Sequence, residues 1–341
     1  MSSFKKIMVG VIGAALFALG FAGAASAEPE KKDVTLGVGG KSALYYLPLT
    51  VTEKKGFFEE EGLNVTIQDF KGGSKSLQAL MGGSVDVVTG AYEHTIRMQA
   101  KGQDLVAVIE LGRFPGIVVG VRGDLADKVN SVKDLKGLKV GVTAPGSSTN
   151  NIVNFALAKA GLSPRDVSII GVGAGSTAVA AMENKEIDAI SNIDPAISMI
   201  DKKVGLKLIV DTRTEKDTIA LLGAPAPAAV LYLKPEFAEE NPQTVQALVN
   251  ALYKGLQWLA NASAEEVAAI VPESYYLGDR DMYTKAVAAS LDAYSRTGKI
   301  TEEGMKGASA LLSFDESLDL DSIDLSKTFD SRFIDKVSSA N

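Results

Sequence analysis

Residues 73–90, GSKSLQALMGGSVDVVTG, align without a gap on residues 175–192, GSTAVAAMENKEIDAISN, at an offset of 102 residues. Each segment opens on a Gly-Ser pair and carries an aspartate near its end, Asp86 in the first and Asp188 in the second. In both, a helical pattern is followed by a short apolar run typical of a strand. A weaker match pairs residues 36–38 with residues 140–142. The repeat predicts two successive lobes built on one βα plan.

Working outward from the repeat, short β-rich runs alternate with amphipathic segments from residue 33 onward. This alternation is typical of βαβ units and parallel sheets, so the predicted fold class is α/β. Strands are expected at residues 34–39, 64–70, 85–91, 105–111, 117–122, 139–143, 167–172, 187–192, 206–211 and 228–233. After residue 240 the pattern is mainly helical, with helices expected at 242–261, 265–270, 281–295 and 302–312.

The runs at 117–122 and 228–233 bracket the second lobe and lack a helical period. We interpret them as two strands that cross between the lobes and form a hinge. The first lobe is then discontinuous, comprising residues 28–120 and 220–341 with the helical tail, and the second lobe covers residues 121–219. The two lobes are expected to enclose a central cleft.

The N-terminus has the three parts of a secretory signal peptide. Lys5 and Lys6 precede an apolar run over residues 7–25, which ends in the small residues Ala25-Ser26-Ala27 before a charged segment. An uncleaved membrane anchor is the alternative, but the Gly and Ala content and the small-residue cleavage site favour removal after Ala27. The mature protein is therefore expected in the periplasm.

Composition narrows the class of protein further. The chain has no cysteine, which excludes disulfides, thiolate metal sites and the acylated cysteine of a surface lipoprotein. Loss of Lys5 and Lys6 with the leader changes the formal net charge from −7 to −9. Such a charge favours a soluble protein, here expected to be a monomer, and argues against a nucleic-acid partner.

The carboxyl ends of the predicted strands locate a candidate binding site, because ligands of open α/β sheets bind at the loops beyond those ends. Each lobe offers three such loops. They lie at residues 39–46, 71–75 and 90–94 in the first lobe and at 143–149, 173–177 and 192–196 in the second. If the lobes face each other, all six loops line one cleft between them, which is a favoured place for a small-molecule site.

The strongest local signal is the segment APGSSTNN at residues 144–151, directly after a predicted strand and before a helix. Hydroxyls of Ser147, Ser148 and Thr149 and free backbone N–H groups at such a helix start favour negative charge. An ordinary Ser/Thr helix cap is the alternative. Because Ser74 and Ser176 repeat the pattern, we expect three helix starts directed at one cleft to bind an anion or another polar ligand.

Charged and aromatic candidates lie near the same loops. Arg113 could grip a carboxylate or sulfonate through two hydrogen bonds. His94, the only histidine, could donate a hydrogen bond to an anion or serve a structural role. Tyr45, Tyr46 and Phe114 could form an aromatic wall or pack in the core. Asn192 and Asp194 can offer hydrogen bonds in the second lobe, and Asp194 before Pro195 could equally be a helix cap.

Several catalytic and metal-dependent functions do not fit the residue inventory. One histidine cannot build a histidine-rich metal centre, and no Gly-x-Ser-x-Gly nucleophile elbow is present. The glycines at 171, 173 and 175 have the wrong spacing for a dinucleotide loop. The acidic stretch at 315–330 lacks the ligand and turn glycine that a calcium loop requires. We expect no catalytic residue, no metal and no cofactor.

Five motifs occur along the chain: YLPL at 46–49, EKKGFFEEEGL at 53–63, GGSVD at 82–86, VKDLKG at 132–137 and PGSS at 145–148. In these motifs the chain resembles the nitrate, sulfonate and taurine class of ABC-importer solute-binding proteins, the NMT1/THI5-like family. The resemblance covers about residues 34–260, and the tail only by its helical character. Where many relatives read Trp-Glu-Pro, this chain has Ile193-Asp194-Pro195.

This resemblance implies a type II periplasmic-binding fold with the ligand held between the lobes. Carried onto matching positions, it implicates Ser42, Tyr45, Tyr46, Gly90, Tyr92, Ser147, Ser148, Thr149 and, more loosely, Asp194. The implied function is capture of a small solute, which is an organic sulfonate or carboxylate, with or without an aromatic body, or nitrate. The implied partners are a membrane permease and its cytoplasmic ATPase.

Two other classes of function share the same fold. One is an exported enzyme related to the thiamine-pyrimidine synthases, which consume their own histidine and use a cysteine-rich iron motif. A chain with no cysteine cannot follow that pattern. The other is a protein that presents a bound solute to a sensor, which would use the same cleft.

Overall fold

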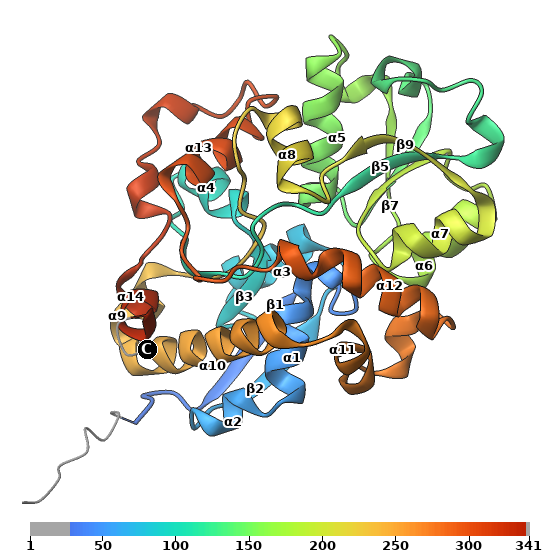
Figure 1. Ribbon diagram of the computed structural model, residues 1–341. Coiled ribbons are helices and arrows are strands. Elements are labelled where there is room, and N and C mark those ends of the chain that lie inside the picture. Colours follow the sequence, from blue (N-terminus) through green and yellow to red (C-terminus); the bar gives the residue numbers. More distant parts are fainter. Residues whose placement is uncertain (1–27, 339–341) are drawn as a thin grey trace, which may run out of the picture.

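The computed structural model describes residues 28–338, which form two α/β lobes with a helical tail (Figure 1). The signal peptide expected at residues 1–27 lies outside the described residues. Within residues 28–338, no helix is both long enough and apolar enough to cross a membrane.

The first lobe contains a five-stranded sheet in the order β2-β1-β3-β10-β4. Its strands are β1 (Asp33–Val38), β2 (Asn64–Asp69), β3 (Val87–Ala91), β4 (Val106–Glu110) and β10 (Ala229–Leu233). The edge strand β2 alternates exposed and half-buried residues, as expected for a strand covered on one face, whereas β3 and β10 are buried throughout. β1 runs parallel to β2 and β3, and β10 runs antiparallel to β3 and β4.

The second lobe repeats this arrangement with the order β7-β6-β8-β5-β9. Its strands are β5 (Val118–Arg122), β6 (Lys139–Val142), β7 (Ser168–Gly171), β8 (Ala189–Asn192) and β9 (Leu206–Asp211). Here β5 is the antiparallel strand, between β8 and β9. The predicted repeat is therefore present in three dimensions. In each sheet the fourth strand, β10 or β5, runs antiparallel to both of its neighbours.

The two aspartates of the repeat explain why that sequence match exists. Asp86 accepts a hydrogen bond from the Thr35 backbone N–H at 2.8 Å, and Asp188 accepts one from the Lys139 backbone N–H at 3.0 Å. Asp86 thus ties the start of β3 to β1, and Asp188 ties the start of β8 to β6 in the same way. The matching position of the aspartate in the two repeats thus reflects the same hydrogen bond formed once in each lobe.

The chain passes between the lobes twice, but not along the strands expected to make the crossing. Both runs at 117–122 and 228–233 are strands, yet β5 lies wholly in the second sheet and β10 wholly in the first. The crossing is made by residues 111–117 and 212–228, which lie next to those strands in the chain. A strand in the middle of a sheet is fixed by hydrogen bonds on both sides, so the freedom to move falls to these connecting residues.

Helices cover the faces of both sheets, and the tail packs back on the first lobe (Figure 1). In the first lobe they are α1 (Leu47–Lys54), α2 (Phe57–Glu60), α3 (Gly73–Met81) and α4 (Glu93–Gln99), preceded by a 3-10 turn at Leu44–Tyr46. The second lobe has α5 (Ser148–Lys159), α6 (Ser176–Glu183), α7 (Ala196–Val204) and α8 (Glu215–Leu222). The tail has α9 (Pro235–Glu240), α10 (Pro242–Asn261), α11 (Ala264–Ile270), α12 (Arg280–Ser290), α13 (Glu302–Ala310) and α14 (Arg332–Ser338).

The long helix α10 shows why the tail is part of the first lobe. Proline occupies its first turn, where no intrahelical N–H partner is needed, and a stripe of leucine and valine residues along one side is fully buried. That stripe packs against α1, α2 and α14. The tail also reaches the sheet itself, because the backbone N–H of Ala107 in β4 donates to the carbonyl of Thr328 at 2.9 Å.

Candidate functional site

The two lobes contact each other at the starts of α3 and α5, two of the helix starts predicted from sequence to line the cleft. Ser147, which precedes α5, accepts a hydrogen bond through its hydroxyl from the backbone N–H of Ser74 at 2.9 Å. The Ser74 hydroxyl in turn donates to the Pro145 carbonyl at 2.8 Å. The hydroxyl of the second lobe therefore caps α3 of the first lobe, so these two serines join the lobes.

Further polar contacts cross the same interface. The backbone N–H of Leu44 donates to the Asp194 carbonyl at 2.8 Å. Farther along α4 and α5, the Arg97 guanidinium donates to the Asn151 side-chain oxygen at 2.9 Å. These contacts join loops of both lobes, so the described conformation is the closed one.

A small central cavity remains between the lobes. Its accessible volume of about 20 Å³ is enough for roughly one water molecule. Both lobes line it, through Gly39, Tyr45, Tyr46, Gly73, Ala91, Ile117, Thr143, Ser147, Ser148, Thr149 and Ile193. Five of the hydroxyl and aromatic candidates selected from sequence at the start of α5 and in the first loop meet here: Ser147, Ser148, Thr149, Tyr45 and Tyr46.

The first turn of α5 gives this cavity hydrogen-bond donors. Among the described residues, the backbone N–H groups of Ser148 and Thr149 have no hydrogen-bond partner. The helix dipole adds partial positive charge at the same place. This end of α5 therefore suits an acceptor oxygen of a ligand.

Two tyrosines form the wall that the first lobe contributes. Their rings meet edge to face with centroids 4.8 Å apart. Burial, with a smaller contribution from the nearby Glu93 carboxylate, raises the pKa of both Tyr45 and Tyr46 above the ordinary value. Both hydroxyls are therefore protonated at neutral pH and can donate hydrogen bonds.

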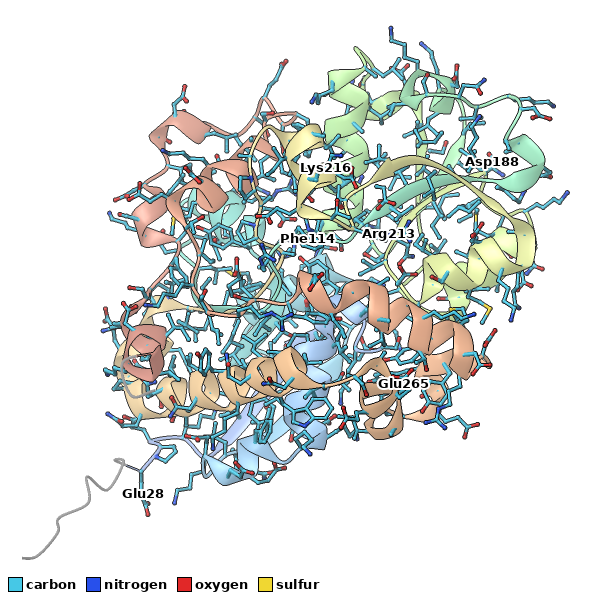
Figure 2. All side chains as sticks on the ribbon, viewed as in Figure 1. Glu28, Phe114, Asp188, Arg213, Lys216 and Glu265 are labelled. Atoms are coloured by element: carbon cyan, nitrogen blue, oxygen red, sulfur yellow. The ribbon has the colours of Figure 1, made fainter. Side chains whose placement is uncertain are left out.

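A second cavity lies on the hinge side of the first and shares Tyr45 and Ile193 with it. It leaves about 40 Å³ for the centre of a water-sized molecule and is mostly apolar. The crossing residues 112 and 114–116, together with Leu44, Tyr45, Ile193, Asp194, Arg213, Ala228, Ser290, Ala293 and Tyr294, line it. Phe114, expected in an aromatic wall, is here, and Figure 2 shows it beside the crossing segments, close to Arg213.

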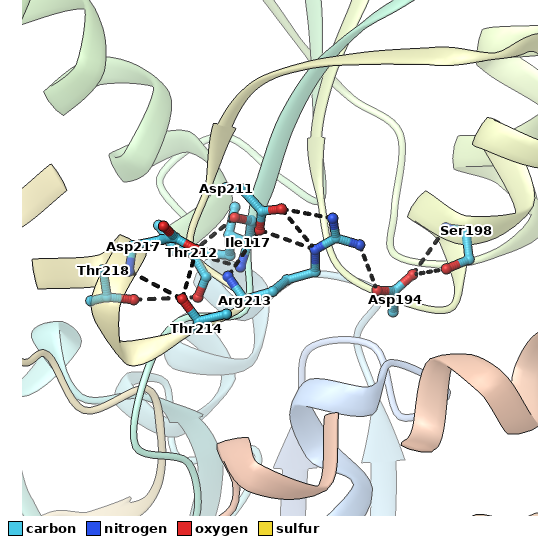
Figure 3. Close-up of polar contacts among 9 residues, drawn as sticks. All are labelled: Ile117, Asp194, Ser198, Asp211, Thr212, Arg213, Thr214, Asp217 and Thr218. Carbon is cyan, nitrogen blue, oxygen red and sulfur yellow. Dashed lines mark hydrogen bonds and ion pairs between the residues drawn. The ribbon is translucent and has the colours of Figure 1, made fainter. Parts of the chain in front are cut away.

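Arg213 is the cation of this cavity, and it was not among the residues selected from sequence. It follows β9, so the rule that selected the other strand ends could have found it. Its guanidinium binds Asp211 through Nε at 3.0 Å and Nη2 at 2.7 Å, and Nη1 lies 3.5 Å from Asp194 (Figure 3). Two carboxylates thus surround one guanidinium, and the hydrogen bonds with Asp211 raise the pKa of Arg213.

Asp194 connects this cluster to α7. One of its carboxylate oxygens accepts from the Ser198 backbone at 2.9 Å and from the Ser198 hydroxyl at 2.6 Å (Figure 3). The peptide bond between Asp194 and Pro195 is cis. The side chain therefore caps the first turn of α7 and lines the cavity as well, so the two roles weighed from sequence coexist.

A larger outer pocket opens between the lobes beyond the central cavity, with about 510 Å³ for the centre of a water-sized molecule. Ser42 and Ser176 lie here, on opposite sides of the interface. Lys41 also lines it, and its ammonium is 2.6 Å from the Glu53 carboxylate. These serines lie at the entrance to the cleft and do not line the central cavity.

Four of the selected residues lie elsewhere. The Arg113 guanidinium donates to Glu215 at 2.7 Å and to the Asp292 carbonyl at 3.2 Å, outside both cavities. The Tyr92 hydroxyl contacts the Thr328 hydroxyl in the tail. Gly90 leaves space for the Tyr232 ring, because a Cβ atom there would lie 2.6 Å from it. Asn192 is buried and donates to the Gly173 carbonyl at 2.9 Å, joining two loops of its own lobe.

His94 is fully buried behind the central cavity. Its Nδ1 lies 3.2 Å from the Tyr232 hydroxyl, and its Nε2 has no hydrogen-bond partner among the described residues. Burial lowers the pKa of His94 to about 4, so the ring is neutral at physiological pH. A neutral ring next to Gly73 and Ser147 supports the wall of the cavity and brings no positive charge to it.

Comparison with known proteins gives the same picture of the fold. A solved structure from Bordetella bronchiseptica RB50 is similar at 47% identity, with a TM-score of 0.90 over 92% of this chain and 99% of that one. The periplasmic nitrate-binding protein of Synechocystis PCC 6803 is similar in fold, with a TM-score of 0.67 at 18% identity over 92% of this chain and 90% of that one. Such neighbours have the type II periplasmic-binding-protein fold.

Sequence relatives include both binding proteins and an enzyme. A Bacillus subtilis protein named provisionally as an aliphatic sulfonates-binding protein is 28% identical over 74% of this chain and 74% of its own length. The 4-amino-5-hydroxymethyl-2-methylpyrimidine phosphate synthase of Legionella pneumophila is 24% identical over 78% of this chain and 81% of its own.

The family model described as NMT1/THI5 like matches residues 43–266. These include the loops around both cavities, except the first part of the β1 loop and the tail residues 290, 293 and 294. The matched segment contains the helix starts of α3, α5 and α6, and the crossing residues on both sides of the second lobe. With the fold, the repeat and the closed cleft in agreement with it, this match shows that the chain belongs to the NMT1/THI5-like family.

Proposed function

We propose that this protein is the periplasmic solute-binding component of an ABC importer and that it captures a small organic solute with an acidic group, a sulfonate or carboxylate. The acidic group of the solute enters the central cavity and its carbon skeleton the adjoining hinge-side cavity. The solute is then released to a membrane permease that works with a cytoplasmic ATPase. The observation that carries the proposal is the first turn of α5, where Ser148 and Thr149, with unpartnered backbone N–H groups, line a cavity between the two lobes.

The two cavities together favour an organic solute over nitrate. The central cavity supplies donors from α5, Tyr45 and Tyr46 to an acidic group. The adjoining hinge-side cavity is mostly apolar and offers Phe114 and Tyr294 to a carbon skeleton. A solute with an acidic head and a short apolar or aromatic body matches both parts.

Closure supplies the mechanism of delivery. A solute bound to one lobe gains contacts to the other only when the lobes close, so binding favours the closed form. The crossing residues 111–117 and 212–228 are the only places where the described chain passes between the sheets, so rotation takes place there. The permease then recognises the surface that both lobes present together.

We do not extend the enzymatic activity of the Legionella relative to this chain. A cysteine-rich metal motif cannot be built from a chain with no cysteine, and its one histidine is buried with a neutral ring. A pyrimidine nevertheless belongs in a ligand screen, because turnover or tight binding of such a compound would contradict this assignment.

The proposal is tested by thermal shift of the mature protein against alkanesulfonates, aliphatic and aromatic carboxylates, nitrate and pyrimidines. Binding to the folded state raises Tm by mass action, so a dose-dependent rise with sulfonates or carboxylates is expected. A response to pyrimidines alone, or to no member of the set, would contradict the proposed solute class.

A matched pair of variants locates the site. Tyr46→Phe removes a hydroxyl donor from the wall of the central cavity and is expected to weaken affinity for the bound acid about tenfold, the effect of one hydrogen bond. Arg113→Ala removes a side chain that lies outside both cavities and is expected to leave affinity within about twofold. Equal losses in the two variants, measured by calorimetry, would place the site elsewhere.

A further inference from the structure

Glu93 is a buried acid between the lobes that the sequence did not single out. It begins α4 in the first lobe, its side chain is buried, and only 3% of the residue is exposed. The Ser148 hydroxyl of the second lobe donates to its Oε1 at 2.5 Å, and the Asn151 amide donates to the same oxygen at 3.3 Å. Both recorded hydrogen bonds thus use one carboxylate oxygen.

No positive charge is paired with this carboxylate. Among residues 28–338, no lysine, arginine or histidine nitrogen forms an ion pair with Glu93. Arg97, one turn farther along α4, reaches Glu93 only through Asn151, to which it donates at 2.9 Å. His94 is neutral because burial lowers its pKa to about 4. A carboxylate buried in this way is costly unless another group supplies a positive charge.

The carboxylate lies at the wall of the central cavity. Its hydrogen-bond partner Ser148 lines that cavity, as do Tyr45 and Tyr46, whose pKa values Glu93 helps to raise after the main effect of burial. The free donors of α5 and the unpaired carboxylate of Glu93 therefore lie side by side. A solute with an acidic group alone would satisfy the donors and leave Glu93 without a countercharge.

We infer that Glu93 is a specificity-determining residue that selects solutes carrying an ammonium or a similar positively charged donor beside their acidic group. The inference rests on the proposed function and narrows its solute class from organic acids to zwitterions. Closure without such a solute buries the carboxylate unpaired, so Glu93 also makes closure depend on the positive group of the solute.

The test compares solutes that differ by one ammonium group. The pairs are 2-aminoethanesulfonate with ethanesulfonate and 4-(aminomethyl)benzoate with 4-methylbenzoate, titrated by calorimetry at pH 7. In the pair that binds more tightly, the wild-type protein is expected to bind the solute with the ammonium group at least about tenfold more tightly than the solute without it. Glu93→Gln is expected to bring that ratio close to one. Glu215→Gln, which removes an exposed acid outside both cavities, is the control and should keep the wild-type ratio.

The outcomes separate this inference from the proposed function. Tight binding of ethanesulfonate or 4-methylbenzoate, which lack the ammonium group, with a ratio that Glu93→Gln does not change, would overturn the role of Glu93 and leave solute capture intact. Failure of every acid to bind would count against the proposed function itself.

A second measurement decides the inference even without a bound solute. If Glu93 is an uncompensated buried charge, ligand-free Glu93→Gln should melt about 2 °C higher than wild type or scatter as a more compact particle. If Glu93 serves only as an acceptor that joins the lobes, the neutral amide should lower Tm or leave the particle more open. A Tm and a radius of gyration that are both unchanged would also overturn the inference.

Discussion

Gly72→Leu is expected to abolish tight solute binding while both lobes stay folded. Gly72 has an extended backbone with φ of −178°, which any residue can adopt. A Cβ atom there would lie 2.6 Å from the Ala144 Cβ, and the three atoms nearest to it all belong to the second lobe. The added side chain therefore projects against the second lobe and obstructs closure. Overpacking of this kind costs about 1–3 kcal/mol. That cost should reduce affinity about a hundredfold.

Calorimetry and small-angle scattering check this expectation together. Gly72→Leu should give a larger radius of gyration than wild type at saturating solute, with a ligand-free Tm close to wild type. Gly82→Leu, at the exposed end of the same helix, is the matched control and should bind normally. In a second pair, Gly72→Ala should weaken binding and the added change Ala144→Gly should restore it. Wild-type affinity in Gly72→Leu would show that the lobes need not close this far.

Glu110→Gln is expected to stabilise the protein by about 3 kcal/mol above neutral pH and to change its stability little near pH 4.5. Glu110 ends β4 close to the crossing residues and is only 8% exposed. Burial raises its pKa from 4.5 to about 7, and a hydrogen bond with Ser295 and the charge of Arg113 offset this only in part.

The raised pKa of Glu110 determines how stability changes with pH. Because the folded protein holds the proton more tightly than the unfolded chain, the contribution of Glu110 is fully present below pH 4.5 and is lost as pH rises through about 7. Glutamine carries no proton to lose, so the variant should not show this loss. Urea unfolding at pH 5 and pH 8 measures it, with Glu239→Gln, at an exposed position of α9, as control. A gain of the same size at both pH values would contradict a titrating Glu110.

The elements with a strong local pattern were predicted closely from sequence. α10 has the expected bounds of 242–261, and β9 those of 206–211, because each has a complete apolar pattern between clear boundaries. Other strands, such as β3 and β8, begin two residues later than expected. The expected helix at 281–295 ends instead at Ser290 and continues as a 3-10 turn, Leu291–Ala293.

The site was predicted more unevenly than the fold. Residues on helix starts and first loops, such as Ser148 and Tyr46, do line the cavity. Arg113 and Arg213 look alike in sequence, since each follows a strand, but only Arg213 lines a cavity. Tyr92 was chosen by the same rule, and its hydroxyl contacts Thr328 far along the chain. The end of a strand can be predicted from sequence and shows where a loop begins. It does not show in which direction the side chains of that loop point.

The sequence by itself determined the α/β class, the two-lobe repeat, the family resemblance and the place of the cleft, because all of these depend on residues close together in the chain. Only the tertiary structure decided which segments cross between the lobes, that Ser147 caps a helix of the other lobe, and that Glu93 is buried without a countercharge. These features depend on contacts between residues more than fifty positions apart. Apolar periodicity and turn residues describe the chain over one or two turns or strands, whereas burial and charge pairing depend on how the two finished lobes meet.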